Sequence, residues 1–171
     1  NISDYLIYVL LATVCDVMPL RKLNRIIALV ALKDFDINKN IAFSELFNLN
    51  NKKNKLTVND LGYLIGPILN AGGRLGKSSF ASVLLSSDNI EVVNIKSNEL
   101  IILNNKRKEI ETLILNEIDF QKIEKENKDV IIYYNPNINE GLIGIIAARL
   151  KDYFNKPSIV ITKSNELLKG S

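Results

Sequence analysis

The chain has 171 residues, 47% of them hydrophobic, which is enough to bury the core of one ordinary domain or of parts of two. Its formal net charge of +3 permits an acidic partner but does not require one, because dedicated nucleic-acid-binding domains are usually more basic. The single cysteine, Cys15, excludes an intrachain disulfide framework and a cysteine-based zinc site, so we expect no disulfide partner and a reducing, cytoplasmic location.

The first predicted element is a buried helix over residues 2–14, because its apolar residues are too continuous for a surface helix. Asp4 lies near its start, where a carboxylate interacts favourably with the helix dipole, and Pro19 follows its end. The apolar run is far shorter than the ~20 residues that span a bilayer. We therefore expect no membrane partner.

Shorter elements are predicted between this helix and residue 90. Three of them follow from apolar spacing or composition: helices over 25–32 and 42–47, and an Asn- and Lys-rich loop over 48–55. Thr57 is a favourable N-cap, with Asp60 three residues later in the acidic position of a capping box. Ser78 and Ser79 indicate the cap of a further helix, which we expect to end near Asp88.

The segment Gly66–Gly76 is rich in residues that interrupt regular structure, with four glycines and one proline. We expect a loop here, whose backbone a ligand can approach closely. Its only charge is on Arg74, a planar donor that suits phosphate, and Asn70 lies one helical turn before it. Taken alone, the segment is equally compatible with a structural turn between helices.

The longest periodic element runs from residue 97 to about residue 127. Apolar residues at seven- and four-residue steps form one stripe on an otherwise charged helix: Leu103, Ile110, Ile114 and Ile118. Three basic residues, Lys106, Arg107 and Lys108, lie beside this stripe, and such a charge run is usually a solvated face. We expect a spacer helix with a solvated basic flank.

The last part of the chain has the pattern strand, helix, strand, over residues 130–134, 141–154 and 158–162. This succession predicts a right-handed βαβ unit, and it makes the fold class α/β. A βαβ unit without further strands leaves its edges unpaired. We therefore expect exposed edges and limited stability in isolation.

Five motifs occur along the chain in the order Leu11–Leu20, Gly66–Gly76, Leu84–Asn89, Gly141–Leu150 and Lys169–Ser171. This set and order resemble the RecJ family of single-strand-specific 5′ exonucleases, in the DHH phosphoesterase superfamily. Each is weak by itself, but together they extend the resemblance over nearly the whole chain. Because the first residue is Asn1 and the last motif is cut short, we expect an internal segment of a longer protein.

The resemblance implies three parts. Residues 1–96 would be the mostly helical C-terminal part of a DHH catalytic domain, residues 97–127 a connector helix, and residues 128–171 the βαβ start of a nucleic-acid-binding DHHA1 domain. It also implies an activity for the parent protein, which is 5′-3′ hydrolysis of phosphodiester bonds in single-stranded DNA during DNA repair and recombination. We expect a monomer that binds single-stranded DNA.

Asp16 is the candidate catalytic and metal-ligating residue. A carboxylate among apolar residues needs a cation, donors or a metal as partner, and by chemistry alone a capping role is as reasonable as metal ligation. The resemblance implies ligation of Mn²⁺ or Mg²⁺, which prefer hard oxygen ligands. The family's other ligands include an Asp-His-His motif, whereas this chain has no histidine, so we expect no nuclease activity from the chain alone.

Seven residues are candidate nucleic-acid contacts: Asn70, Arg74, Gly141, Gly144, Arg149, Lys169 and Ser171. The Arg74 guanidinium suits phosphate, with a salt bridge between domains as the alternative. Gly141 and Gly144 lie at the first turn of a predicted helix, where backbone N–H groups and the helix dipole attract anions. Arg149 is either a strand contact or a solvated residue on the helix face.

Two positions depart from the family. Ile68 stands where the family usually has an arginine, and Ile138-Asn139 stand where it has Trp-His. Both changes imply weaker contact with nucleic acid or a drifting gene. Three function classes therefore remain, namely a RecJ-like exonuclease, another DHH–DHHA1 phosphoesterase that acts on oligoribonucleotides or cyclic dinucleotides, and a non-catalytic remnant. The long connector and the Gly66–Gly76 motif favour the first.

Overall fold

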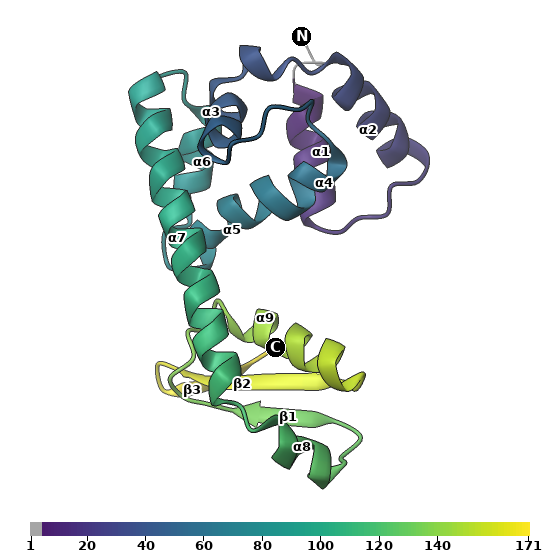
Figure 1. Cartoon of the computed structure of the whole chain (residues 1–171), viewed down its shortest axis with the longest axis vertical. Helices are drawn as coiled ribbons and strands as arrows, with labels where there is room; N and C mark the ends of the chain where they lie inside the picture. The colour runs from purple at the N-terminus through teal and green to yellow at the C-terminus, as the bar shows by residue number, and fades with distance from the viewer. Residues whose placement is uncertain (1–4) are drawn as a thin grey trace. The chain divides into compact units, whose positions relative to one another are not determined.

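The computed structural model describes residues 5–171, which form two compact units. Unit 1 runs to Gly72 and includes Ser78–Asn104, and unit 2 comprises Gly73–Lys77 and Asn105–Ser171. The α/β class is confirmed, because helices precede a three-stranded sheet (Figure 1). The role expected of Asp4 lies outside the described residues. Within residues 5–171 no helix is both long enough and apolar enough to cross a membrane.

Helices and short helical turns occupy the chain from Leu6 to Glu117. They are α1 (Leu6–Cys15), α2 (Lys22–Asp34), the 3₁₀ turn η2 (Ile37–Lys39), α3 (Ile41–Leu49), α4 (Val58–Asp60), the π-helical turn η3 (Leu61–Ile65), α5 (Gly66–Arg74), α6 (Ser79–Ser86) and α7 (Ile90–Glu117). The helices predicted over 25–32 and 42–47 are confirmed, and each extends a few residues further at its ends.

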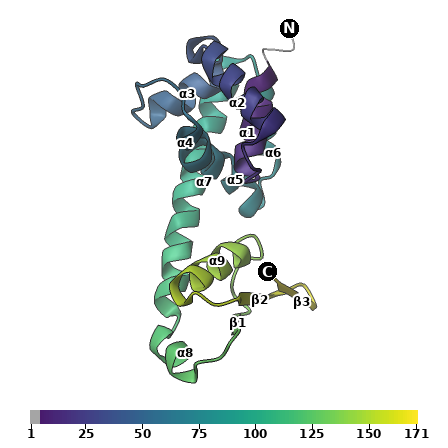
Figure 2. The ribbon, with the colours of Figure 1, turned by 90° about the vertical axis from the view of Figure 1, so that its right-hand side faces the viewer.

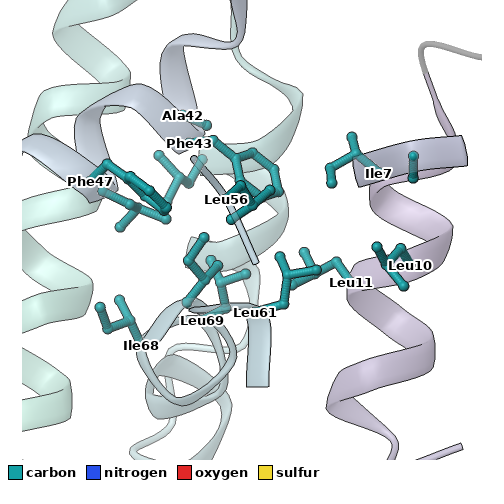
Figure 3. Close-up of a cluster of buried hydrophobic side chains, with 14 of the residues drawn as sticks. Ile7, Leu10, Leu11, Ala42, Phe43, Phe47, Leu56, Leu61, Ile68 and Leu69 are labelled. Atoms are coloured by element: carbon teal, nitrogen blue, oxygen red, sulfur yellow. The ribbon is translucent and has the colours of Figure 1, made fainter. Parts of the chain in front are cut away.

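A single apolar cluster forms the core of unit 1. Figure 3 shows side chains from α1, α3 and α5 converging in it: Ile7, Leu10, Leu11, Ala42, Phe43, Phe47, Ile68 and Leu69. Phe43 is fully buried and makes edge-to-face contacts with Tyr8 and Phe35, at centroid distances of 6.1 and 5.2 Å. Burying a side chain of this size contributes roughly 1.5–3 kcal/mol. The cluster therefore accounts for the packing of these three helices.

The loop expected over Gly66–Gly76 is wrong for most of its length, because Gly66–Arg74 form helix α5. Pro67 has no N–H to donate, but it lies in the first turn of a helix, where that donor is not needed. The π-helical turn η3 immediately precedes it, and the Gly66 N–H bonds to the carbonyl of Leu61, five residues back. A turn appears only after the helix, where Gly76 has a φ of 79°.

Close packing explains why residue 66 is a glycine. A Cβ atom there would lie 2.7 Å from the Cys15 sulfur and 2.8 Å from the Leu61 carbonyl oxygen. Gly66 thus lets α5 approach the end of α1, which carries Asp16. Gly73, on the same helix, has no atom within 4 Å of the corresponding position.

The boundaries around the long helix differ from those expected. Ser78 precedes α6 without a side-chain cap, whereas Asn89 caps α7 by accepting from the Glu91 N–H at 2.8 Å. The helix predicted over 97–127 begins earlier and ends earlier, at Ile90 and Glu117, and a separate helix, α8 (Phe120–Glu126), follows. The break occurs at Asp119, whose side chain accepts from the Lys122 N–H and caps α8.

The capping box is confirmed. The Thr57 hydroxyl accepts from the Asp60 N–H at 3.2 Å, and the Asp60 carboxylate accepts from the Thr57 N–H at 3.0 Å. Lys52 adds an ion pair to Asp60 at 2.6 Å. Burial alone would raise the pKa of Asp60, but the hydrogen bonds from Lys52 and Thr57 lower it below its usual range.

Unit 2 contains a three-stranded sheet in the order β1-β2-β3. Its elements after α8 are β1 (Ile131–Tyr134), α9 (Ile143–Phe154), β2 (Ser158–Ser164) and β3 (Leu167–Gly170). The parallel pairing of β1 with β2, with Ile131 opposite Ser158, confirms the predicted βαβ unit. Helix α9 covers one face of the sheet (Figure 2). The antiparallel hairpin to β3 was missed, because Lys169–Ser171 were read only as a motif.

The core of unit 2 lies between α7, α9 and the sheet. Its fully buried members include Leu142, Ile146 and Leu150, four residues apart on α9 as predicted, and Val160 on β2. The opposite face of the sheet is open, since Ile132 is 66% exposed. β1 and β3 form the two edges of the sheet.

We predict opposite effects for two glycine substitutions in α5. Gly66→Ala should lower the free energy of unfolding by about 1–3 kcal/mol, because the methyl group overlaps Cys15 and Leu61. Gly73→Ala is the control and should raise it by up to about 1 kcal/mol, since alanine restricts the unfolded chain without a clash. Urea unfolding of the two variants measures the difference. Equal effects would contradict the close packing of α5 on α1.

Candidate metal-ligating and nucleic-acid-binding residues

Asp16 lies directly after α1, as its C-terminal capping residue. Its side chain is exposed, so the expectation that apolar neighbours would force it to take a partner is wrong. Among residues 5–171 the carboxylate makes no ion pair or side-chain hydrogen bond, and only its backbone N–H is bonded, to the Ala12 carbonyl at 2.9 Å. The carboxylate is therefore accessible.

The surroundings of Asp16 oppose a negative charge there. The C-terminal end of a helix carries partial negative charge, and no basic residue lies in the last turn of α1. Val17, the next residue, has a φ of 55°, a left-handed conformation that β-branched residues rarely adopt. Strained backbone of this kind tends to occur at functional sites.

Cys15 is the last residue of α1 and directly precedes Asp16. Partial burial raises the pKa of its thiol, and the charge of Asp16 raises it further. A thiol with a raised pKa stays protonated at neutral pH, which makes it a poor metal ligand and a poor nucleophile.

The described residues do not form a complete metal site. No group of three or more His, Cys, Asp or Glu side chains in this part of the chain is placed to hold one ion. Mg²⁺ and Mn²⁺ need several oxygen ligands, and Asp16 provides one carboxylate. It fits as one ligand of such an ion and not as a site by itself.

Arg74 is fixed against the loop before α9, within unit 2. Its Nη1 donates to the carbonyl oxygen of Gly141 at 3.0 Å. A Cβ atom on Gly141 would overlap the backbone carbonyl of Arg74, so the two segments touch only because residue 141 has no side chain. Two residues predicted separately therefore form one contact, in which the Arg74 side chain donates to a backbone carbonyl and not to a carboxylate.

A buried carboxylate on α7 holds two arginines beside this contact. The Glu111 side chain is 8% exposed, and its Oε2 and Oε1 accept from Arg107 Nη1 at 2.8 Å and from Arg149 Nε at 2.7 Å. Partial burial lowers the pKa of Arg74, the charge of Arg107 lowers it further, and Glu111 opposes both. Arg74 nonetheless stays charged, because the pKa of arginine starts far above neutrality.

Sequence reasoning missed Arg107 and Glu111, and the solvated flank predicted for Arg107 is wrong, since its side chain is 12% exposed. The spacing of these two residues in the sequence already indicated that they pair. Arg107 and Glu111 are four residues apart on one helix face, and Glu111 precedes the buried Ile114 and Ile118 by three and seven residues. The predicted stripe also included Leu103 and Ile110, which are half-buried.

The loop before α9 and the first turn of that helix lie beside the predicted residues Lys169 and Ser171. Glu140 accepts from Lys169 Nζ at 3.2 Å, and hydrogen bonds from Ser164 and from Lys169 lower its pKa. A Cβ atom on Gly144 would lie 3.0 Å from the Ser171 hydroxyl. No side chain caps the first turn of α9, and among the described residues the backbone N–H groups of Ile143 and Gly144 have no acceptor, whereas those of Gly141 and Leu142 bond to Asn139.

The remaining positions singled out in the sequence separate into two kinds. Asn70 is exposed on α5, one turn before Arg74. Ile68 and Ile138, which depart from the family pattern, are both buried in apolar cores. Asn139 accepts from the Gly141 N–H at 2.8 Å and shapes the loop. Both isoleucines therefore have a packing role.

Comparisons with known proteins agree over the whole length of the chain. It is 35% identical over 179 aligned residues to the single-stranded-DNA-specific exonuclease RecJ of Salmonella typhimurium, covering 100% of this chain and 31% of that protein. It is also 35% identical over 181 residues to the protein of the same name from Haemophilus influenzae, again covering 100% and 31%. The chain belongs to the RecJ family. It spans about a third of the length of these relatives.

The fold of this RecJ-family chain also matches solved structures. A crystal structure of RecJ in complex with Mg²⁺ from Thermus thermophilus has a TM-score of 0.80 at 23% identity, over 94% of this chain and 25% of that one. The corresponding complex with Mn²⁺ has a TM-score of 0.81 at 22% identity, over 94% and 24%. No protein-family model matches the sequence.

We predict that Gly141→Ala disturbs unit 2 and that Gly144→Ala does not. The alanine methyl at 141 overlaps the Arg74 backbone and should lower the free energy of unfolding by about 1–3 kcal/mol. At 144 the methyl meets only a serine hydroxyl that can rotate, so the change should stay below about 1 kcal/mol. Denaturant unfolding of both variants measures this, and an equally large loss for Gly144→Ala would contradict the Arg74 contact.

Proposed function

We propose that this chain is part of a divalent-metal-dependent exonuclease that degrades single-stranded DNA from its 5′ end, in DNA repair and recombination. One observation carries the proposal, namely the 35% identity over the full chain to proteins named single-stranded-DNA-specific exonuclease RecJ. Because the chain spans 31% of those proteins, the activity is proposed for the longer protein that contains it.

Within that protein we assign three parts. Residues 1–96 are the end of the DHH catalytic domain, residues 97–127 the connector, and residues 128–171 the start of the DHHA1 domain. The extended helix α7 and the βαβ unit that follows it support this division.

Asp16 supplies one oxygen ligand to a Mn²⁺ or Mg²⁺ site whose other ligands lie outside residues 5–171. Two features support this role. The carboxylate is accessible and unpaired within the described residues, and it lies at a helix end whose dipole disfavours it, so a bound cation would relieve an existing repulsion. The complexes of Thermus thermophilus RecJ with Mg²⁺ and with Mn²⁺ support the choice of ion.

Unit 2 supplies contacts to the DNA backbone. Arg74 and Arg149 provide fixed positive charge, and the uncapped first turn of α9 provides the backbone N–H groups of Ile143 and Gly144. Lys169 and Ser171 lie beside the same turn. None of these groups reads a base edge, which suits an enzyme that degrades DNA of any sequence.

The activity is tested by nucleotide release from single-stranded DNA with a 5′ phosphate, with duplex DNA of the same sequence as the comparison. We predict Mn²⁺-dependent release from the single strand by the longer protein and none by the chain alone. Asp16→Asn in the longer protein should lower the rate by about 100-fold or more, since loss of even an outer-shell partner of a metal costs up to that much.

Asp36→Asn is the matched control, because it removes another exposed carboxylate next to a helical turn of unit 1. It should leave nucleotide release unchanged. Full activity of Asp16→Asn would remove Asp16 from the site. Release from oligoribonucleotides alone, or from neither substrate, would contradict the proposed function.

A further inference from the structure

The side chain of Glu111 is buried, and a buried carboxylate costs free energy unless its oxygens are paired. It is buried on α7, and each of its two oxygens accepts from a different arginine, Arg107 on the same helix and Arg149 on α9. Both pairs are charge-assisted and short, at 2.8 and 2.7 Å. The carboxylate therefore links α7 to α9 through side chains that would otherwise repel each other.

The cluster keeps an excess of positive charge. Arg107, Glu111 and Arg149 together carry one net positive charge, and Arg74, close enough for its pKa to respond to both Arg107 and Glu111, brings a second. A cluster with a net positive charge attracts anions.

Arg149 is fixed at its Nε, and its two terminal nitrogens can still donate to a ligand. Glu111 binds its Nε, the side chain is 58% exposed, and the two terminal nitrogens have no further partner among the described residues. Bidentate binding of a phosphate uses such nitrogens. An arginine fixed at Nε loses less conformational freedom when it binds than a free one.

We propose that Glu111 is a positioning residue, which holds Arg149 so that its terminal nitrogens bind a backbone phosphate of single-stranded DNA. This inference rests on the proposed function, because it takes that DNA as the ligand. Glu111 itself does not contact the DNA. It acts through Arg149, although its negative charge lowers the overall attraction for an anion.

This role can be separated from the effect of charge. If only the summed charge mattered, Glu111→Gln would tighten DNA binding, because it adds one positive charge. If Glu111 positions Arg149, the same change should weaken binding by about tenfold, the loss expected for one charge-assisted hydrogen bond. The two explanations predict opposite signs.

The experiment measures the affinity of the chain for a 5′-phosphorylated single-stranded oligodeoxynucleotide by fluorescence anisotropy, at low and at physiological salt. Glu109→Gln is the matched control, since it makes the same charge change at an exposed position of the same helix. It should leave binding unchanged or slightly tighter. Weaker binding by Glu111→Gln, but not by Glu109→Gln, is the expected result.

A cycle with Arg149→Lys tests whether Glu111 acts through Arg149. In that background Glu111→Gln should have no further effect, whereas an independent structural role would give additive losses. If Glu111→Gln does not fold, Glu111→Asp keeps the charge, withdraws the carboxylate from Arg149 and should still weaken binding.

Unchanged or tighter binding by a folded Glu111 variant, or additive losses in the cycle, would overturn the positioning role while the proposed function stands. No binding by the unchanged chain would overturn the DNA contacts assigned to unit 2 and with them the positioning role, whereas nucleotide release by the longer protein tests the proposed function separately.

Discussion

Unit 2 depends on one buried ionic interaction, the pairing of Glu111 with Arg107 and Arg149. A buried ion without partners costs several kcal/mol, so neither the carboxylate nor the largely buried Arg107 is stable alone. Glu111 pairs with Arg107 on its own helix and with Arg149 on α9. The same interaction therefore joins two helices and places positive charge where a phosphate can use it.

Two glycines provide the close contacts that the family motifs require. Gly66 lets α5 approach α1 near Asp16, and Gly141 lets the loop before α9 touch the backbone of Arg74. A methyl group at residue 141 would displace Arg74, which we assign to the site, and one at residue 66 would displace Cys15, the neighbour of Asp16. The glycines thus contribute to function through packing, which differs from the open, ligand-accessible backbone that glycine-rich sequence usually indicates.

Sequence reasoning was most reliable where a pattern is local. The Thr57–Asp60 capping box and the parallel βαβ unit follow from neighbouring residues or from simple periodicity, and both are confirmed. It failed where tertiary contacts decide. The composition of Gly66–Gly76 indicated a loop, yet packing against α1 favours a helix. The sequence around Glu111 indicated a solvated charge, because its partner Arg149 lies on another helix, 38 residues later. The role of Asp16 stays a prediction, because its proposed partners lie outside the described residues.

The most direct test of the DNA-binding surface is a titration of the isotopically labelled chain with a 5′-phosphorylated single-stranded oligodeoxynucleotide, followed by NMR. The largest chemical-shift changes should occur at the backbone amides of residues 73–76 and 139–144 and at the side-chain Nε–H of Arg149, which together line the proposed phosphate contacts. Changes confined to α2 or to the open face of the sheet around Ile132, or no change at all, would contradict the central claim.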